Sequence, residues 1–291
     1  MQQSPAWRNV TRMGSYAFAD LALSRRLERA EAAANASFVD ARSRLAPSVG
    51  ATWIDVDGTW AMFDGVGSPL TQTFGLGLFS TPLDEQLDVL EAFFATRHSG
   101  VLHEISPLAD PTTLALLGAR DYRPLEHSSV MHRPIDGATA GPSAPEVHVR
   151  VTTPQEVSLW ANASALGWGE YPEFGDFMRD IGTVMGNSRH TVCFLAEIDG
   201  AVAATGAISM HDGVALLAGA STLPACRGRG AQNALLQARI AYATTHGCDL
   251  AQMVAQPGSS SQRNAERQGF RIAYTRTKWA RREHASTATR D

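Results

Sequence analysis

The chain has 291 residues, of which 44% are hydrophobic and 19% are charged, and its formal net charge is −4. These values indicate a folded protein with a sizeable core and room for two domains, and the small negative charge excludes a general affinity for nucleic acid or anionic membranes. No stretch approaches the roughly 18 uninterrupted apolar residues of a membrane-spanning helix, and the start lacks the pattern of a secretion signal. The three cysteines, Cys193, Cys226 and Cys248, lack metal-type spacing, so we expect a cytoplasmic protein with reduced thiols and no metal.

The first half of the chain is expected to alternate helices and strands. Apolar spacing predicts a long amphipathic helix, and Asp57-Gly58 is typical of the turn of a β-hairpin. In chain order we expect a helix over 21–45, a hairpin within 51–63, a strand within 72–82, a helix and a strand within 87–105, and a helix and a strand within 116–134.

A segment rich in Gly, Ala, Ser and Pro, residues 136–146, is expected to be a linker between residues 1–135 and 147–284, with 285–291 as a tail. In the second half, Thr153 followed by Pro154 and Glu156 is typical of a capped helix start. In chain order we expect helices within 152–166 and 174–185, a hairpin over 191–210 that turns at Asp199-Gly200, a strand over 214–222, a helix within 233–246, a strand within 248–256, a short helix within 259–268 and a strand within 270–282.

The two halves repeat the same order of elements, which indicates an internal repeat. Ser80-Thr81 corresponds to Ser221-Thr222 at a shift of 141 residues, whereas His98 corresponds to His246 at a shift of 148, a difference of 148 − 141 = 7 residues. This difference falls between a strand and the helix after it, where only the second half carries the letters CRGRG. We therefore expect one fold twice, with a glycine-arginine loop in the second copy alone.

That loop lies within LPACRGRGAQNALL, residues 223–236, and leads into a helix. A glycine-rich turn before a helix N-terminus exposes backbone N–H groups that favour an anion, usually a phosphate. Gly228 and Gly230 let the backbone approach closely, and Arg227 and Arg229 add charge. The letters match neither a nucleotide-triphosphatase loop nor a dinucleotide-binding fingerprint. A plain strand-to-helix turn with two solvated arginines is the alternative that these residues alone leave open.

Pro224, Arg227 and Gly230, after a strand of small residues, resemble the pyrophosphate loop of the GNAT superfamily of N-acetyltransferases, although Gln232 stands where that family has Gly or Ala. The letters NAERQGF resemble the family's last helix and its Gly-Phe turn. The resemblance covers residues 147–282, and the first half resembles a degenerate copy. It implies an α/β (α+β) fold of two tandem GNAT-like domains, each a mixed, mostly antiparallel central sheet flanked by helices.

The resemblance also implies which residues hold the cosubstrate, acetyl-CoA or a short acyl-CoA. The strand before the loop would free its backbone N–H groups for the ligand, although a plain central strand is the alternative for that stretch. The expected cofactor-binding residues are Ala220, Ser221, Thr222, Arg227, Gly228, Arg229, Gly230, Ala231, Gln232 and Asn264.

Candidates for proton transfer are less well defined by the pattern. Glu170 and Asp176 are acids near the expected cleft, and either is alternatively a solvated surface acid. The family's usual tyrosine acid is replaced by Ala265, which leaves Ser261 and Asn264 as polar groups for the sulfur or the pantetheine arm. Asn264 alternatively lies on the surface, and Tyr274 is expected to pack.

Two further sets of residues complete the candidates. Trp168 and Tyr171 are expected to line the acceptor pocket, with aromatic packing under the first helices as the alternative. His103 and Glu104 are adjacent on an expected strand, so their side chains should point to opposite faces and not act together.

These features predict an N-acetyltransferase in which a primary amine attacks acetyl-CoA directly in a ternary complex. The alternative is a non-catalytic acyl-CoA sensor or interaction protein, which the missing tyrosine and the degenerate first copy favour. The expected partners are acetyl-CoA and an amine, with no nucleic acid or membrane, and the sequence leaves a monomer and a homodimer equally open.

Overall fold

The structure, a computed structural model, describes residues 16–135, 146–169 and 172–281. The first half supplies three α-helices and five strands. They are α1 (Leu21–Leu45), β1 (Thr52–Val56), β2 (Thr59–Phe63), β3 (Gln72–Phe74), α2 (Asp84–Ala95), β4 (Leu102–Ile105), α3 (Thr112–Ala119) and β5 (Tyr122–Pro134), with a short 3-10 helix at Pro47–Val49.

The second half adds four α-helices and six strands. They are β6 (Val147–Val151), α4 (Val157–Leu166), α5 (Gly175–Gly186), β7 (Thr191–Ile198), β8 (Ala201–His211), β9 (Val214–Thr222), α6 (Ala231–Thr245), β10 (Leu250–Ala255), α7 (Ser260–Arg267) and β11 (Arg271–Arg281), with 3-10 helices at Pro154–Glu156, Pro172–Phe174 and Pro224–Cys226.

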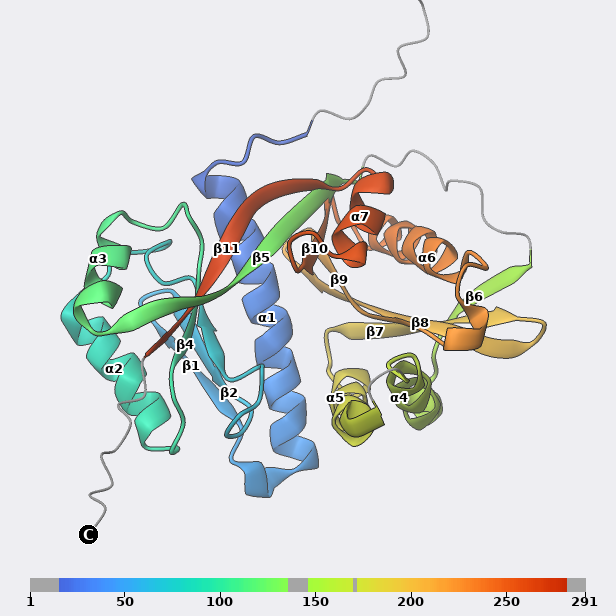
Figure 1. The fold of residues 1–291 in the computed structure, drawn as a ribbon, viewed down its shortest axis with the longest axis horizontal. Coiled ribbons are helices and arrows are strands. Elements are labelled where there is room, and N and C mark those ends of the chain that lie inside the picture. Colours follow the sequence, from blue (N-terminus) through green and yellow to red (C-terminus); the bar gives the residue numbers. More distant parts are fainter. Residues whose placement is uncertain (1–15, 136–145, 170–171, 282–291) are drawn as a thin grey trace, which may run out of the picture.

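All eleven strands join one sheet in the order β1-β2-β3-β4-β11-β5-β10-β9-β8-β7-β6. The last strand of each half has crossed to the other half's strands. Strand β11 pairs antiparallel with both β4 and β5, and β5 pairs antiparallel with β10. The two halves therefore share their hydrogen bonds along the whole centre of the sheet, which is visible where the green and red strands run together in Figure 1.

Helix α1 crosses the middle of the molecule and packs against strands of both halves (Figure 1). Leu27 and Ala30 pack with Val130 of β5 and Leu250 of β10, and Ala32 packs against the first half. Its N-terminus is capped by Asp20, whose carboxylate accepts a hydrogen bond from Leu23 N–H. Helices α6 and α7 cover one face of the second half, and α4 and α5 cover the other.

Most predicted elements are confirmed, several of them residue for residue. The α1 and β9 bounds match the prediction, the capping box at Thr153 and Glu156 forms, and the hairpin turns at Asp199-Gly200 with positive φ at both residues. Strand β6 was not among the expected elements. The strand expected within 72–82 ends at Phe74, because positive φ at Gly75 and Gly77 turns the chain.

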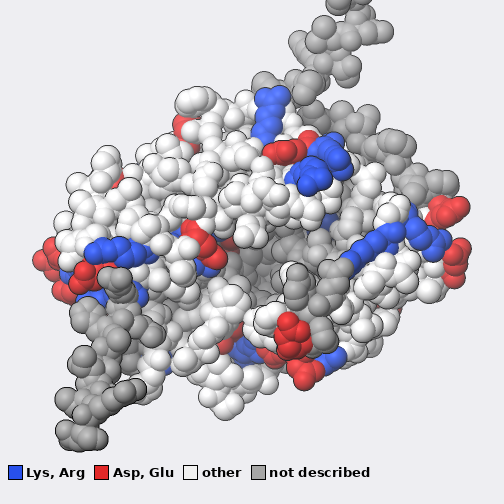
Figure 2. Space-filling model, in the orientation of Figure 1, with Lys and Arg blue, Asp and Glu red and all other residues white. Residues whose placement is uncertain are grey.

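The expected sheet arrangement differs in one respect from the observed one. Two tandem units with a sheet each were expected, whereas the strands form a single sheet because β5 and β11 are exchanged. The expected linker lies outside the described residues except for Glu146, and the tail lies wholly outside them. Across the parts that the structure describes, the helices are all too short or too polar to cross a bilayer. On the face of the molecule that Figure 2 shows, charged side chains of both signs lie in small mixed groups.

Candidate functional site

Strands β9 and β10 lie side by side as parallel strands but separate before they end. They pair from Val214 opposite Leu250 to Leu216 opposite Gln252, and beyond that pair they form no further ladder. Strand β9 nevertheless continues to Thr222, held by β8 on its other side. The backbone groups of β9 that face this opening lack a strand partner, so they are free to bind an extended ligand.

A β-bulge shapes β9 along this opening. The register shifts between the pairs Thr205–Ser221 and Ala207–Ala218, so Gly219 and Ala220 lie opposite the single residue Gly206. The Ala220 side chain is exposed, whereas a Cβ on Gly219 would lie 3.0 Å from the ring of Trp160. The bulge therefore fits only small side chains, and it re-aims the backbone N–H groups of this stretch.

A buried arginine on α6 donates hydrogen bonds to both strands that form the bulge. The Arg239 guanidinium donates hydrogen bonds to the carbonyl oxygens of Ala207, at 3.1 Å, and Ala218, at 3.2 Å. Burial lowers the pKa of Arg239 to about 10. Gly206 is required beside it, because a Cβ there would lie 3.0 Å from the guanidinium carbon. Sequence reasoning missed Arg239, since a single arginine on an amphipathic helix resembles a surface residue.

The glycine-arginine loop lies at the N-terminus of α6, as expected. Gly228 and Gly230 have φ of +78° and +82°, a left-handed conformation that favours glycine, and Gly230 is the N-cap. The first turn closes where Ala234 N–H donates to Gly230 O at 3.1 Å. The amides of Ala231 and the two residues after it therefore have no intrahelical acceptor and carry the positive end of the helix dipole. This arrangement suits a phosphate group.

Both loop arginines are exposed and contact neighbouring elements. Arg227 donates to Gly167 O at 3.1 Å, which joins the loop to the end of α4. Arg229 donates to Asp199 in the β7–β8 turn at 3.1 Å. Because exposed ion pairs are weak, the Arg229 guanidinium can exchange this partner for a phosphate.

Gln232, the departure from the family pattern, points back to the sheet. Its side-chain amide donates to Ser221 O at 2.8 Å and Thr222 Oγ1 at 2.9 Å. The Ser221 hydroxyl in turn donates to Ser164 O at 2.8 Å. A Cβ on Gly167 would lie 1.7 Å from Ser221 Oγ, so glycine is needed there. Both the hydroxyl and the carbonyl oxygen of Ser221 are therefore already hydrogen-bonded, and Gln232 braces β9 against the loop.

The remaining sequence candidates lie on several elements. Ser261 and Asn264 are exposed one turn apart on α7, and Ala265 is buried in the core. Asp176 on α5 is exposed and pairs with Arg179. Trp168, at the end of α4, is 44% exposed, so it is available to a ligand. Glu170 and Tyr171 lie outside the described residues.

His103 and Glu104 do point to opposite faces of the sheet. The His103 ring shares a hydrogen bond with Thr73 Oγ1 at 2.8 Å, and burial lowers the pKa of His103 to about 3. Glu104 lies on the α1 side, where its carboxylate is 2.9 Å from Arg276 Nε. Tyr274 is buried on β11 and packs in the core beside α1, as expected, and its hydroxyl donates to Glu28 at 2.9 Å. Sequence reasoning missed this charged cluster, whose members come from three separate elements.

Residues 160–270 match the model of the acetyltransferase (GNAT) family. These residues form a GNAT domain. The predicted resemblance to the GNAT superfamily is thereby confirmed for this segment, which contains β9, the loop, α6 and β10.

Solved structures with the same fold cover both halves of the chain. A GCN5-related N-acetyltransferase from Kribbella flavida matches with a TM-score of 0.59 and 18% identity, over 85% of this chain and 96% of that one. A tandem GNAT protein from the clavulanic acid biosynthesis pathway matches with a TM-score of 0.54 and 13% identity, over 76% of this chain and 77% of that one. A GCN5-related N-acetyltransferase from Sphaerobacter thermophilus matches with a TM-score of 0.50 and 18% identity, over 72% of this chain and 71% of that one. A search of curated proteins found no match. The predicted tandem GNAT fold is confirmed.

Proposed function

We propose that this chain binds acetyl-CoA, or a short acyl-CoA, and transfers the acyl group to a primary amine. The observation that carries the proposal is the glycine-arginine loop, which presents unpaired amides at the start of α6 beside the opening between β9 and β10. In that arrangement the pyrophosphate lies on the loop and the pantetheine arm runs along the freed edge of β9. Acyl transfer is the reaction of the family that the second half matches.

The amine nitrogen attacks the thioester carbon directly in the ternary complex. The new N–C bond forms, the C–S bond breaks, the amine loses a proton and the CoA thiolate gains one. Backbone N–H groups at the bulge, near Ala220, stabilise the negative charge on the thioester oxygen. With Ala265 buried in place of a tyrosine, Ser261 and Asn264 are the side chains on α7 that donate hydrogen bonds to the sulfur or the pantetheine arm. Glu170 remains the candidate base.

The first half is proposed to be a copy that does not bind CoA. At the matching helix start, α2 has Asp84 and Glu85 in its first turn, which repel a phosphate. Leu78 is buried after β3, whereas the corresponding position of the second half is Gly219, in the β9 bulge. The division into residues 1–135 and 147–284 remains a prediction, and the exchanged strands make the halves structurally interdependent.

A non-catalytic acyl-CoA sensor is the second candidate, because Ala265 removes the family's usual acid. Both candidates bind acyl-CoA, so only turnover separates them. Release of free thiol from acetyl-CoA across a panel of amines would favour the enzyme, and binding without any release would favour the sensor.

The loop assignment is tested by Gly230→Glu, which places a carboxylate beside the proposed pyrophosphate. Gly247→Glu is the matched control, since Gly247 follows α6 with φ of +78° and open space around its Cα. Both changes carry the same backbone penalty. We expect acetyl-CoA to raise the melting temperature of wild type and of Gly247→Glu but not of Gly230→Glu. Equal stabilisation of all three proteins would refute the assignment.

A further inference from the structure

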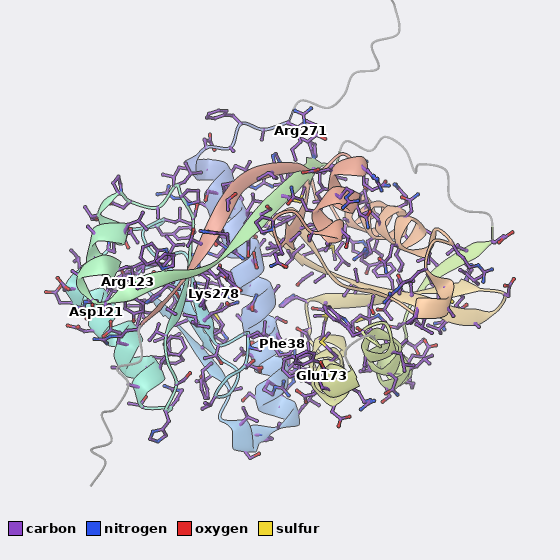
Figure 3. The ribbon with its side chains drawn as sticks, in the orientation of Figure 1. Phe38, Asp121, Arg123, Glu173, Arg271 and Lys278 are labelled. Atoms are coloured by element: carbon purple, nitrogen blue, oxygen red, sulfur yellow. The ribbon has the colours of Figure 1, made fainter. Side chains whose placement is uncertain are left out.

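A cluster of charged side chains lies in the interior between α1 and the centre of the sheet. Arg276 of β11 is 2% exposed and contacts three carboxylates, with Glu28 Oε2 at 3.2 Å, Glu31 Oε2 at 2.7 Å and Glu104 Oε2 at 2.9 Å. Lys278, on the same strand and labelled in Figure 3, bridges Glu104 and Glu126. Four acidic side chains therefore face two cations, an excess of acid that favours an additional positive charge in this region even when Glu28 carries a proton.

Two buried amide oxygens beside Glu31 have no hydrogen-bond partner among the residues that the structure describes. Gln252 of β10 is 0% exposed, and its Oε1 is unpaired while its Nε2 donates to Glu31 Oε2 at 3.4 Å. Asn35 is 9% exposed, and its Oδ1 is unpaired while its Nδ2 donates to Glu31 O at 2.9 Å. These donor contacts fix which end of each amide is oxygen. Because both unpaired atoms are acceptors, the group that satisfies them must be a hydrogen-bond donor.

The carboxylate of Glu31 also has acceptor capacity left. Arg276 donates to both of its oxygens, at 2.7 and 2.9 Å, and Gln252 takes a third direction. A carboxylate offers about four lone-pair directions, so one remains. Its side chain is 12% exposed, more than that of Glu28 or Glu104. Of the three acids that contact Arg276, Glu31 is therefore the one that a ligand can reach most readily.

The position of Gln252 connects this region to the proposed reaction. It lies opposite Leu216 in the last pair before β9 and β10 separate. Its neighbour Ala251 packs with residues of α6, whereas the Gln252 side chain points to the other face and meets α1. A group bound at Gln252 would thus lie at the apex of the opening, on the face opposite the loop-bearing helix.

Resting on the proposed function, we propose that the acceptor is a cationic primary amine whose ammonium group binds Glu31, Gln252 Oε1 and Asn35 Oδ1, and that it gives one proton to the general base before the neutral amine attacks the thioester. An ammonium supplies three N–H donors and a positive charge, which matches two unpaired oxygens and a carboxylate. Helix α1 of the first half thereby forms part of the acceptor site, although that half carries no loop of its own. Phe38, one turn beyond Asn35 and labelled in Figure 3, packs α1 against α5 along the same side.

Gln252→Met tests the proposal without the usual ambiguity of a buried substitution. It removes an unsatisfied buried oxygen, so the melting temperature should not fall. The KM for the amine should rise by about tenfold, since a hydrogen bond to a charged group is lost, while the KM for acetyl-CoA stays unchanged. A purely structural role for Gln252 would instead lower the melting temperature and leave the KM for the amine unchanged.

Glu31→Gln and Glu126→Gln form the matched pair for charge. Each removes one carboxylate from the cluster, but Glu126 is 52% exposed and faces Lys278. Phenethylamine, cadaverine and spermidine serve as cationic probes, and aniline as a neutral one. We expect Glu31→Gln to lose the preference for cationic amines and Glu126→Gln to keep it.

The results separate this inference from the proposed function. Equal effects of Glu31→Gln and Glu126→Gln, or a wild-type preference for aniline, would overturn the ammonium site while leaving acyl transfer intact. Failure of wild type to acetylate any of the amines, with acetyl-CoA still bound, would overturn both the amine reaction and the site that depends on it.

Discussion

Glu28 makes the stability of this protein depend on pH in a direction opposite to that of most carboxylates. It lies in α1 with a side chain only 1% exposed. Burial raises its pKa from 4.5 to about 7, with Arg276 opposing and Glu31 and Glu104 reinforcing the increase, while the Tyr274 hydroxyl opposes it. The folded chain therefore binds more protons than the unfolded chain between these two pKa values, and stability falls as the pH rises through this window.

The size of the effect follows from the two pKa values. Between pH 4.5 and about 7, each pH unit costs about 1.4 kcal/mol, so the protein loses about 3 kcal/mol of unfolding free energy from this group. In Glu28→Gln the side chain is neutral at every pH, while its oxygen still accepts from Tyr274. We expect the unfolding free energy of the variant, relative to wild type, to increase by about 2.5 kcal/mol from pH 5 to pH 8, because part of the window lies below pH 5.

Urea denaturation followed by circular dichroism at pH 5, 6, 7 and 8 measures this difference. Glu85→Gln, which changes an exposed residue of α2, is the control and should show no comparable trend. A Glu28→Gln variant that is destabilised by the same amount at all four pH values would refute the reasoning. That result would mean that Glu28 is ionised throughout and that Arg276 outweighs its burial.

Two further substitutions test how the second half holds its opening. Gly167→Ala places a Cβ 1.7 Å from Ser221 Oγ, so it should lower the unfolding free energy by about 1–3 kcal/mol. Calorimetry should also show weaker binding of acetyl-CoA. Gly175→Ala is the control, since a Cβ there has no described atom within 4 Å, and it should be neutral or stabilising. Arg239→Met removes the donor to the carbonyl oxygens of Ala207 and Ala218 at the bulge. It should therefore lower the unfolding free energy by about 1–3 kcal/mol and raise the KM for acetyl-CoA. Unchanged melting temperature and KM in Arg239→Met would show that the bulge does not depend on this residue.

Local sequence patterns predicted the elements well because local interactions decide them. Residues 21–45 have helical apolar spacing and an Asp20 cap, and Asp199-Gly200 can adopt the positive φ that a tight hairpin turn requires. The loop at α6 was predictable for the same reason, since its glycines and its position between strand and helix are visible in the letters.

The exchange of β5 and β11 was not predictable from local patterns. Strand β5 has a run of exposed residues followed by a run of buried ones, and β11 has no regular alternation. Neither pattern distinguishes pairing within one half from pairing with the other half, so only the whole sheet determines the choice. The same holds for the acceptor side. Glu31 and Asn35 look like solvent-facing residues of a long helix, and only the folded chain brings them to Gln252 at the apex of the opening.

The most direct test of the central claim is a crystal structure with a non-hydrolysable acetyl-CoA analogue. We expect the pyrophosphate to lie on the backbone amides of Gly228 to Gln232 and the acyl group to lie between β9 and β10 beside Ala220. A pyrophosphate bound at any other place on the protein, or an analogue that leaves the β9–β10 opening empty, would contradict it.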